Sequence, residues 1–178
     1  MAVLTESRTA LPTGTWVLDP VHSTIAFELP YLAGTFRGQF RDVDAKLTEQ
    51  SLTGSARVAS VQVKDENLTA HLQSPDFFDA ERHPELSFES RELERAGEQL
   101  IVRGDITIRG VTKPVELTGT IAGPITDGHG RERINLNVST TVDRTGFGLN
   151  WNMPLPSGEP ALANDVKLIA ELYFVREA

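Results

Sequence analysis

A two-residue alternation runs through the stretch Gln99-Leu-Ile-Val-Arg-Gly-Asp-Ile-Thr-Ile-Arg109. Its apolar and polar members separate into two sets, with Leu100, Val102, Gly104, Ile106 and Ile108 set against Arg103, Asp105, Thr107 and Arg109. Successive side chains of a β-strand point to opposite faces, so the pattern predicts a strand with one apolar face. One-sided strands are typical of antiparallel sheets, because parallel strands are usually buried on both faces.

Similar strand-like stretches recur on both sides of this segment. They lie at residues 24–29, 36–40, 55–63, 85–89, 115–121, 134–142 and 165–176. Asp127-Gly128-His129-Gly130 is a hairpin turn signal between two of them. About eight such strands either close into a barrel or stack as a sandwich. Glycines inside strands, at Gly38, Gly104 and Gly119, fit the bends of a closing barrel.

Residues 65–82 depart from the alternation and are predicted to be helical. Asp65 can cap a helix start, and Leu68 and Leu72 fall at i and i+4 on one helix face. The triplet Ser74-Pro75-Asp76 predicts a second helix start, with serine as cap and proline in the first turn. We expect this short insertion to cover a barrel mouth with four apolar side chains, namely Leu68, Leu72, Phe77 and Phe78.

The composition excludes several classes of protein. The 178 residues include 17 basic and 25 acidic side chains, for a net charge of −8, and no cysteine. Nucleic-acid binding needs clustered cations, which are missing here, and an acidic surface disfavours anionic lipid. Disulfides, thiolate nucleophiles and cysteine-ligated zinc are excluded.

The overall organisation is that of a single domain. Residues 1–13 are predicted to be an N-terminal tail and residues 14–178 one barrel domain, in line with usual domain sizes. Nothing resembles a secretory signal, and no apolar run is long enough to span a membrane. A cytoplasmic location is therefore the expectation.

The polar residues show no catalytic or metal-binding constellation. The four histidines, His22, His71, His83 and His129, lack the spacings that place two metal ligands on one face. Asp19, His22 and Ser23 suggest a hydrolase triad, but neighbours in an extended segment point to opposite faces. We expect His22 and Ser23 to bond backbone groups, with no catalytic residues, metal or cofactor. The apolar strand faces are compatible with either a filled or a hollow barrel.

The ordered motifs resemble the YceI family, a lipocalin-like group, from about Gly14 to Arg176. The resemblance is carried by these stretches: Trp16-Val-Leu-Asp-Pro-Val-His22-Ser23-Thr-Ile-Ala-Phe27, Thr35-Phe-Arg-Gly38-Gln-Phe40, His71-Leu-Gln-Ser74-Pro75-Asp76-Phe77-Phe78-Asp79, His83-Pro84-Glu-Leu-Ser-Phe88, Gly104-Asp-Ile-Thr-Ile-Arg109-Gly110-Val-Thr112-Lys-Pro-Val115, Asp143-Arg144-Thr-Gly-Phe147-Gly148 and Asn164-Asp-Val-Lys-Leu168. The chain departs from the family pattern at Leu68-Thr69, where Arg-Asp is common, and in showing no signal peptide.

The resemblance implies an all-β fold, an extended eight-stranded antiparallel lipocalin-like barrel with a helical insertion, often dimeric. It also implies a hollow interior that holds a polyisoprenoid, an isoprenoid quinone or a fatty-acid-like amphiphile. A long chain gains about 0.8 kcal/mol per buried CH₂, so few polar contacts are needed. We therefore expect a carrier or sequestering protein and no enzyme. The rivals are a lipid-modifying barrel enzyme (isomerase, cyclase or esterase) and an interaction module with a filled barrel.

The carrier hypothesis assigns each candidate residue a place. The tunnel is expected to be lined by Phe27, Phe36, Phe40, Phe88, Ile106, Ile108, Leu136 and Leu168. Phe147 and Trp151 are expected near a rim. The candidates for contact with a polar head group are His22, His71 and Arg144, each with the structural alternative of bonding the backbone.

Overall fold

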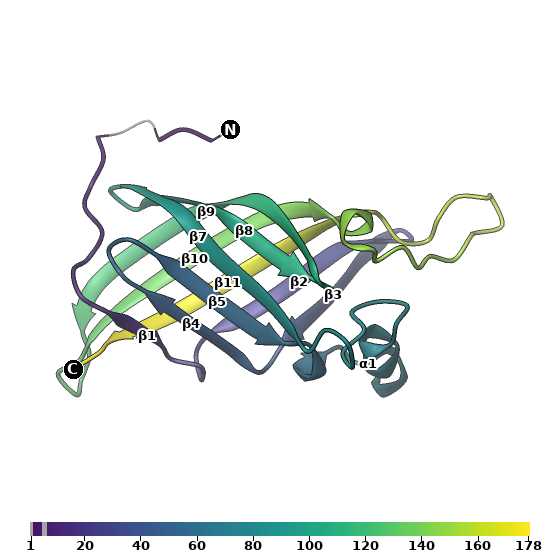
Figure 1. The fold of residues 1–178 in the computed structure, drawn as a ribbon, viewed down its shortest axis with the longest axis horizontal. Coiled ribbons are helices and arrows are strands. Elements are labelled where there is room, and N and C mark those ends of the chain that lie inside the picture. The colour runs from purple at the N-terminus through teal and green to yellow at the C-terminus, as the bar shows by residue number, and fades with distance from the viewer. Residues whose placement is uncertain (1, 5–6) are drawn as a thin grey trace.

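The computed structural model describes residues 2–4 and 7–178 and shows a single antiparallel sheet rolled into a barrel (Figure 1). Its strands are β1 (Trp16–Leu18), β2 (Thr24–Tyr31), β3 (Gly34–Phe40), β4 (Val43–Leu47), β5 (Leu52–Arg57), β6 (Val61–Gln62), β7 (Glu85–Ala96), β8 (Gln99–Ile108), β9 (Val111–Thr126), β10 (Glu132–Asp143) and β11 (Asp165–Arg176). Its helices are α1 (Glu66–Gln73) and two short 3₁₀ segments, η1 (Val58–Ser60) and η2 (Arg144–Phe147).

The eleven strands form a barrel of eight, because three pairs of consecutive strands are halves of bent strands. β1 and β2 both pair with β11, at Leu18 opposite Phe174 and at Thr24 opposite Glu171. β4 and β3 likewise pair with β1 and β2, and β5 and β6 pair with β4 and β3. The contacts of β11 with β1 and β2 close the ring. The predicted eight-stranded antiparallel barrel is therefore confirmed, and the sandwich is excluded.

Glycines provide room for close approaches inside the barrel wall. A Cβ atom on Gly38 would lie 2.4 Å from the ring of Phe27, which lies across the neighbouring strand. A Cβ atom on Gly104 would lie 2.3 Å from the carbonyl oxygen of Glu89, next to a register shift between β7 and β8. These positions fit the predicted use of glycine at bends and bulges.

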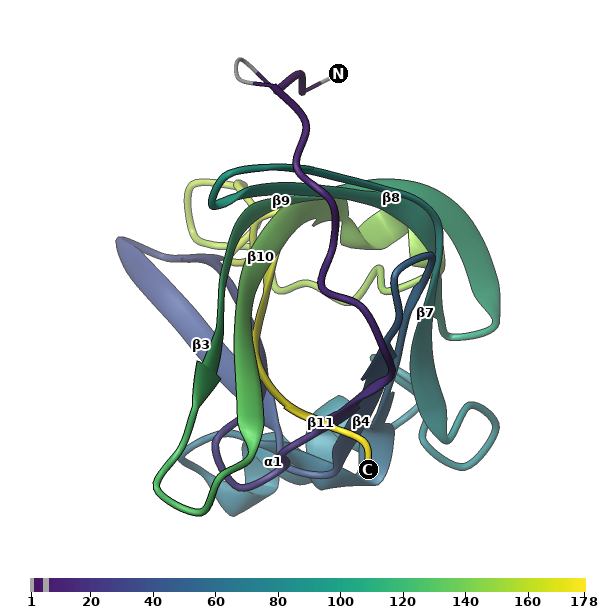
Figure 2. The ribbon, with the colours of Figure 1, turned by 90° about the vertical axis from the view of Figure 1, so that its left-hand side faces the viewer.

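One end of the barrel is filled by side chains. Twelve buried residues form a cluster there, and Trp16 and Phe174 are fully buried within it. Figure 2 shows the N-terminal segment crossing this end, and Leu11 of that segment packs against the cluster. The predicted tail, residues 1–13, includes residues 1, 5 and 6, which lie outside the described residues. Further along it, the backbone N–H of Thr9 donates to the carbonyl of Arg95 on β7.

The opposite end carries the predicted helical insertion. Asp65 caps α1 by accepting a hydrogen bond from the backbone N–H of Leu68, at 3.0 Å, as predicted. The second helix expected at Ser74 is wrong, because the structure has consecutive turns there. Ser74 ends α1, and its hydroxyl donates to the carbonyl of His71 at 2.6 Å, so it does not cap a new helix. Asp79 then adopts a left-handed φ of 54°, which interrupts helical geometry.

Candidate ligand-binding cavity

A cavity of about 580 Å³ occupies the barrel half next to α1. Its wall is formed by inward side chains of the strands, and its floor by members of the packed cluster, among them Ala45, Leu52 and Leu172. Tyr31, Leu68 and Met153 also line it and are each more than 40% exposed, so the cavity opens at this end. The volume falls in the usual range for ligand sites, about 300–1,000 Å³. The barrel is thus half filled and half hollow.

Most of the sequence-predicted site residues meet in this cavity. Its lining includes the predicted wall, cover, rim and head-group candidates Phe27, Phe36, Phe40, Phe88, Ile106, Ile108, Leu168, Leu68, Leu72, Phe77, Phe78, Phe147, Trp151, His71 and Arg144. Phe147 is 2% exposed and lies in the wall, so it is not the rim residue that was expected. Trp151 is partly exposed.

Leu136 does not line the cavity. It faces the barrel interior, as its alternation predicted, but it is fully buried in the packed cluster at the filled end. Alternation fixes which face a side chain occupies, whereas its height along the barrel axis depends on the register and tilt of the strands.

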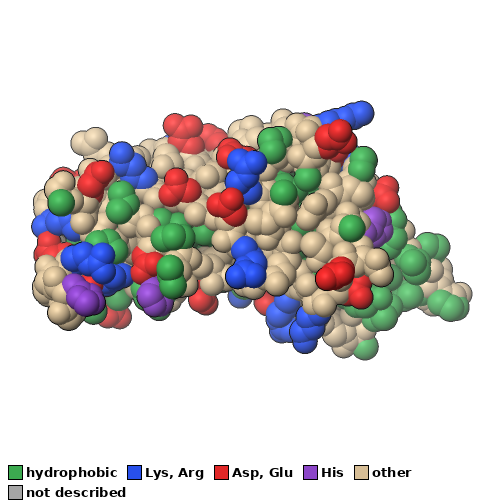
Figure 3. All heavy atoms as spheres, turned by 90° about the horizontal axis from the view of Figure 1, so that it is seen from below, with side chains coloured by type: hydrophobic (Ala, Val, Ile, Leu, Met, Phe, Trp, Pro, Cys, Tyr) green, Lys and Arg blue, Asp and Glu red, His purple; other side chains and the backbone are tan. Residues whose placement is uncertain are grey.

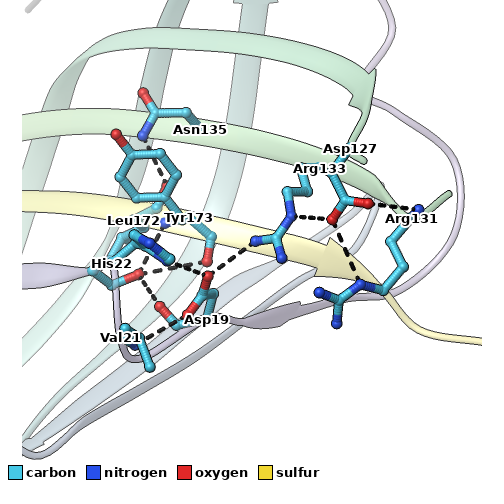
Figure 4. A network of polar contacts seen from close by, with 10 residues as sticks. Asp19, Val21, His22, Asp127, Arg131, Arg133, Asn135, Leu172 and Tyr173 are labelled. Carbon is cyan, nitrogen blue, oxygen red and sulfur yellow. Dashed lines mark hydrogen bonds and ion pairs between the residues drawn. The ribbon is translucent and has the colours of Figure 1, made fainter. Parts of the chain in front are cut away.

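His22 also lies away from the cavity. Its side chain is 65% exposed in the break between β1 and β2, with Nδ1 2.7 Å from Oδ2 of Asp19 (Figure 4). Ser23 bonds backbone groups as predicted: its hydroxyl donates to the carbonyl of Asp19 and accepts from the N–H of Tyr173. His22 itself bonds a carboxylate. The local turn at Asp19-Pro20 therefore directs this histidine outward.

Aromatic rings from three elements meet in the cavity wall. The ring centroids of Phe27 and Phe40 lie 5.8 Å apart, and that of Phe78 lies 6.1 Å and 5.6 Å from them. Phe27 comes from β2, Phe40 from β3 and Phe78 from the turns that follow α1. Edge and tilted arrangements of this kind are the favourable ones for aromatic pairs. The helical insertion is thereby packed onto the barrel wall.

His71 is the polar residue that links α1 to the opposite side of the mouth. Its Nε2 lies 3.0 Å from Oδ2 of Asp76. Its ring meets Phe77 and Trp151 edge-on, with centroid distances of 5.0 Å and 4.9 Å. Because Trp151 belongs to the segment after η2, His71 joins the insertion to that segment.

Arg144 fastens the same segment to the barrel. It is 5% exposed, and its guanidinium donates to three backbone carbonyls, those of Ala163, Leu149 and Trp151, at 2.9, 2.6 and 2.9 Å. Burial lowers the pKa of Arg144. Its Nη2 is buried and has no hydrogen-bond partner among the described residues. The contacts seen are thus the structural alternative that the sequence left open for this residue.

The cavity also includes residues that the sequence analysis did not identify. Leu29 and Val166 extend strand faces whose alternation was recognised, so their inward direction was available from the pattern. Tyr31 is the last residue of β2, two residues beyond the predicted strand, and Met153 and Leu162 lie in the loop segment after η2, so no sequence signal marked them.

The chemistry of the lining is almost entirely that of hydrocarbon. No aspartate, glutamate or lysine contributes to the cavity wall among the described residues, and the ionisable groups there are Tyr31, His71 and Arg144. Across the same residues, no group of three or more histidine or acidic side chains is placed to hold a metal ion. None of the helices described is both long and apolar enough to cross a membrane.

A closed antiparallel barrel with a one-ended apolar cavity places this chain in the class of lipocalin-like barrels. The YceI-like domain model matches residues 16–174, and the chain belongs to this family. A UPF0312 protein of Photorhabdus laumondii is 29% identical over 84% of this chain and 82% of its own length. Another from Pseudomonas putida strain W619 is 34% identical over 72% of this chain and 71% of its own length.

Solved structures share the fold. BcnA of Burkholderia cenocepacia matches with a TM-score of 0.76 at 20% identity, over 88% of this chain and 98% of its own. A polyisoprenoid-binding domain from Saccharophagus degradans, implicated in plant cell wall breakdown, matches with a TM-score of 0.70 at 10% identity, over 91% of this chain and 98% of its own. At these identities the likeness is one of architecture.

Proposed function

We propose that this protein binds a long apolar or amphiphilic chain, such as a polyisoprenoid, an isoprenoid quinone or a fatty-acid-like lipid, and carries or sequesters it. The observation that carries the proposal is the hydrocarbon-lined cavity of about 580 Å³, open at one end. An apolar chain gains about 0.8 kcal/mol for each CH₂ it removes from water, so such a lining suffices for binding. The polyisoprenoid-binding domain with the same architecture supports this ligand class.

The one-ended shape favours a particular ligand orientation. The floor is packed with apolar side chains, while Tyr31 and His71 contribute polar atoms to the lining, and Tyr31 is exposed at the mouth. A polar head group buried at the floor would lose its hydrogen bonds to water without replacement. The tail of the ligand therefore enters first, and its head group stays at the mouth.

Binding is favoured over catalysis by the same lining. General acid–base chemistry requires a positioned titratable group within reach of the substrate. Among the described residues, His71 is the one histidine in the lining, and its Nε2 lies 3.0 Å from Oδ2 of Asp76. No base and nucleophile are paired at the cavity among the described contacts.

Organic extraction of the purified protein, followed by mass analysis, tests the proposal. Ala170 lines the cavity on β11, and the neighbouring Glu171 is exposed on the outer face of the same strand. Ala170→Phe adds a ring inside the barrel and is expected to reduce the recovered lipid, whereas Glu171→Phe adds the same ring outside and should leave it unchanged. A protein that carries no lipid and takes up no added polyprenol, quinone or fatty acid would overturn the proposal. Turnover of a bound lipid that His71→Ala abolishes would favour the enzyme instead.

A further inference from the structure

The cavity mouth is bordered by exposed apolar side chains that form one continuous surface. Tyr31, Leu32 and Met153 are 43%, 56% and 56% exposed. The backbone N–H of Leu32 donates to the carbonyl of Ala161, and the N–H of Ala161 donates to that of Met153. These bonds hold the β2–β3 turn against the segment after η2. We call residues 30–34 and 152–160 together the mouth rim.

The rim lies within two longer segments of the chain that are almost free of charge. Residues 29–36 and 149–164, 24 in all, contain one charged side chain, Glu159, where the chain average of 24% predicts about six. Figure 3 shows apolar side chains gathered at the tip of this end, at the right, and charged ones spread over the rest of the face in view. Ion pairs lie away from these two segments, for example Arg133 with Asp19 and Arg176 with Glu132 at the filled end, and Arg82 with Asp79 beside the helical insertion. The two segments therefore form a nearly uncharged tip on an otherwise charged surface.

We infer that the mouth rim docks on the surface of a lipid bilayer through uncharged, apolar contacts, with the cavity opening toward the membrane. Protein interfaces usually combine an apolar centre with a polar, hydrogen-bonding margin, and charged side chains are nearly absent from these segments. Partly exposed aromatic residues near an apolar rim, here Tyr31 and Trp151, suit the interfacial zone of a bilayer.

The position of the rim also fits this partner. Residues on it, among them Tyr31 and Met153, line the cavity, so rim and cavity wall form one apolar surface. Resting on a bilayer, this surface would give a lipid tail a path that avoids water, and this step of the argument rests on the proposed function. A net charge of −8 and acidic residues near α1, such as Asp65 and Glu66, give anionic lipids no advantage.

Flotation with phosphatidylcholine vesicles tests the inference on the full chain. Leu32→Asp and Met153→Asp are expected to lower the partition coefficient about tenfold or more. Each places a charge where an apolar side chain would contact the bilayer. Val21→Asp and Ile125→Asp are matched controls, since these side chains are 84% and 68% exposed but lie toward the filled end of the barrel. Both controls should float like the unaltered protein, and added salt should have little effect on flotation.

Brominated phosphatidylcholine gives a second, local measurement. The chain has two tryptophans, of which Trp151 lies at the mouth and Trp16 is fully buried at the filled end. Vesicle binding through the rim should quench Trp151 and leave the emission of Trp16. Absence of quenching, equal losses in the Val21 and Ile125 variants, or binding only to anionic vesicles at low salt would overturn the inference.

Two further outcomes separate membrane docking from a dimer interface at the rim and from the proposed lipid binding in the cavity. A dimer in sedimentation that Leu32→Asp abolishes, with no vesicle binding, would assign the rim to a second copy of the chain and overturn membrane docking. Lipid extracted from the same preparations reports on the cavity independently. Vesicle binding by a protein that never holds a lipid would thus support the rim while contradicting the proposed function.

Discussion

The imidazole ring of His71 meets the indole of Trp151 edge-on, with ring centroids 4.9 Å apart and planes at 88°. His71 belongs to α1, whereas Trp151 belongs to the segment that follows η2, 80 residues further along the chain. Phe77 touches both rings, at 5.0 Å from His71 and 5.4 Å from Trp151. The helical insertion and the segment after η2 are therefore joined by a three-ring contact at the cavity mouth.

Removing the indole of Trp151 should loosen the helical insertion that covers the cavity mouth. Trp151→Ala deletes contacts with two aromatic rings, each worth about 0.5–1.5 kcal/mol, so we expect a bound lipid to leave about two- to tenfold faster. Hydrogen exchange of the amides in residues 66–79 should rise in parallel, since these residues lose their partner across the mouth. Trp151→Phe keeps an aromatic ring, so its lipid release and hydrogen exchange are expected to lie between those of the native protein and of Trp151→Ala. Unchanged exchange in Trp151→Ala would show that the contact does not hold the insertion.

Arg144 is expected to act as a structural clamp on the same segment. Arg144→Lys keeps the charge but lacks the planar fork that reaches three carbonyls, those of Ala163, Leu149 and Trp151. Its free energy of unfolding should fall by about 2–4 kcal/mol, which urea denaturation measures. A variant of full stability that has lost its lipid would instead assign Arg144 to the ligand's head group.

The alternation in the sequence was enough to predict most of the strands, because a side chain's face follows from its position in the strand. It left barrel and sandwich open, and the family resemblance implied the closed barrel. The alternation was also not enough to predict how far along the barrel axis a side chain lies. Leu136 and Leu168 both face inward, yet the first lies in the packed cluster and the second in the cavity wall. Pro114 was left outside the predicted strand at residues 115–121, yet it pairs with Asp105 inside β9.

The mouth was the least predictable part of the site. Residues 149–164 have neither a two-residue nor a helical period, so Met153 and Leu162 gave no sign of lining a cavity. Their positions depend on hydrogen bonds between segments, such as that from the N–H of Leu32 to the carbonyl of Ala161. His22 was predicted near a head group, but a local hydrogen bond to Asp19, three residues earlier, holds it on the outer surface.

Acid should weaken the fold through the carboxylates beside Arg133. Oδ2 of Asp127 lies 2.6 Å from Nε of Arg133, and Oδ2 of Asp19 lies 2.9 Å from its Nη1. Hydrogen bonds from Arg133 and from the backbone N–H of Arg131 hold the pKa of Asp127 well below its ordinary value. Burial acts to raise the pKa of Asp19, but hydrogen bonds from His22 and Arg133 outweigh it and lower that pKa.

The direction of the pH effect follows from these shifts. A carboxylate with a lower pKa in the folded state stabilises the fold above its unfolded pKa of about 4, and this stability is lost as the pH falls toward the folded pKa. Asp127→Asn should therefore be less stable than the native chain at neutral pH. Its free energy of unfolding should also decline less steeply between about pH 4 and pH 2. Urea denaturation across this pH range measures how steeply the free energy of unfolding falls in each protein. An equal fall in the native chain and in Asp127→Asn would contradict the lowered pKa of Asp127.

The half-filled barrel predicts that two inward leucines respond differently to truncation. Leu136 is fully buried in the packed cluster, so Leu136→Ala leaves a new void and should lower the free energy of unfolding by about 2–5 kcal/mol. Leu168 faces space that is already open, so Leu168→Ala removes apolar contacts without creating a sealed void and should cost about 1–2 kcal/mol. Leu168→Ala should also hold as much lipid as the native protein or more, because it widens the cavity. Equal losses of stability in urea denaturation would mean that the α1 end is packed like the other, and the cavity would then have no room for a ligand.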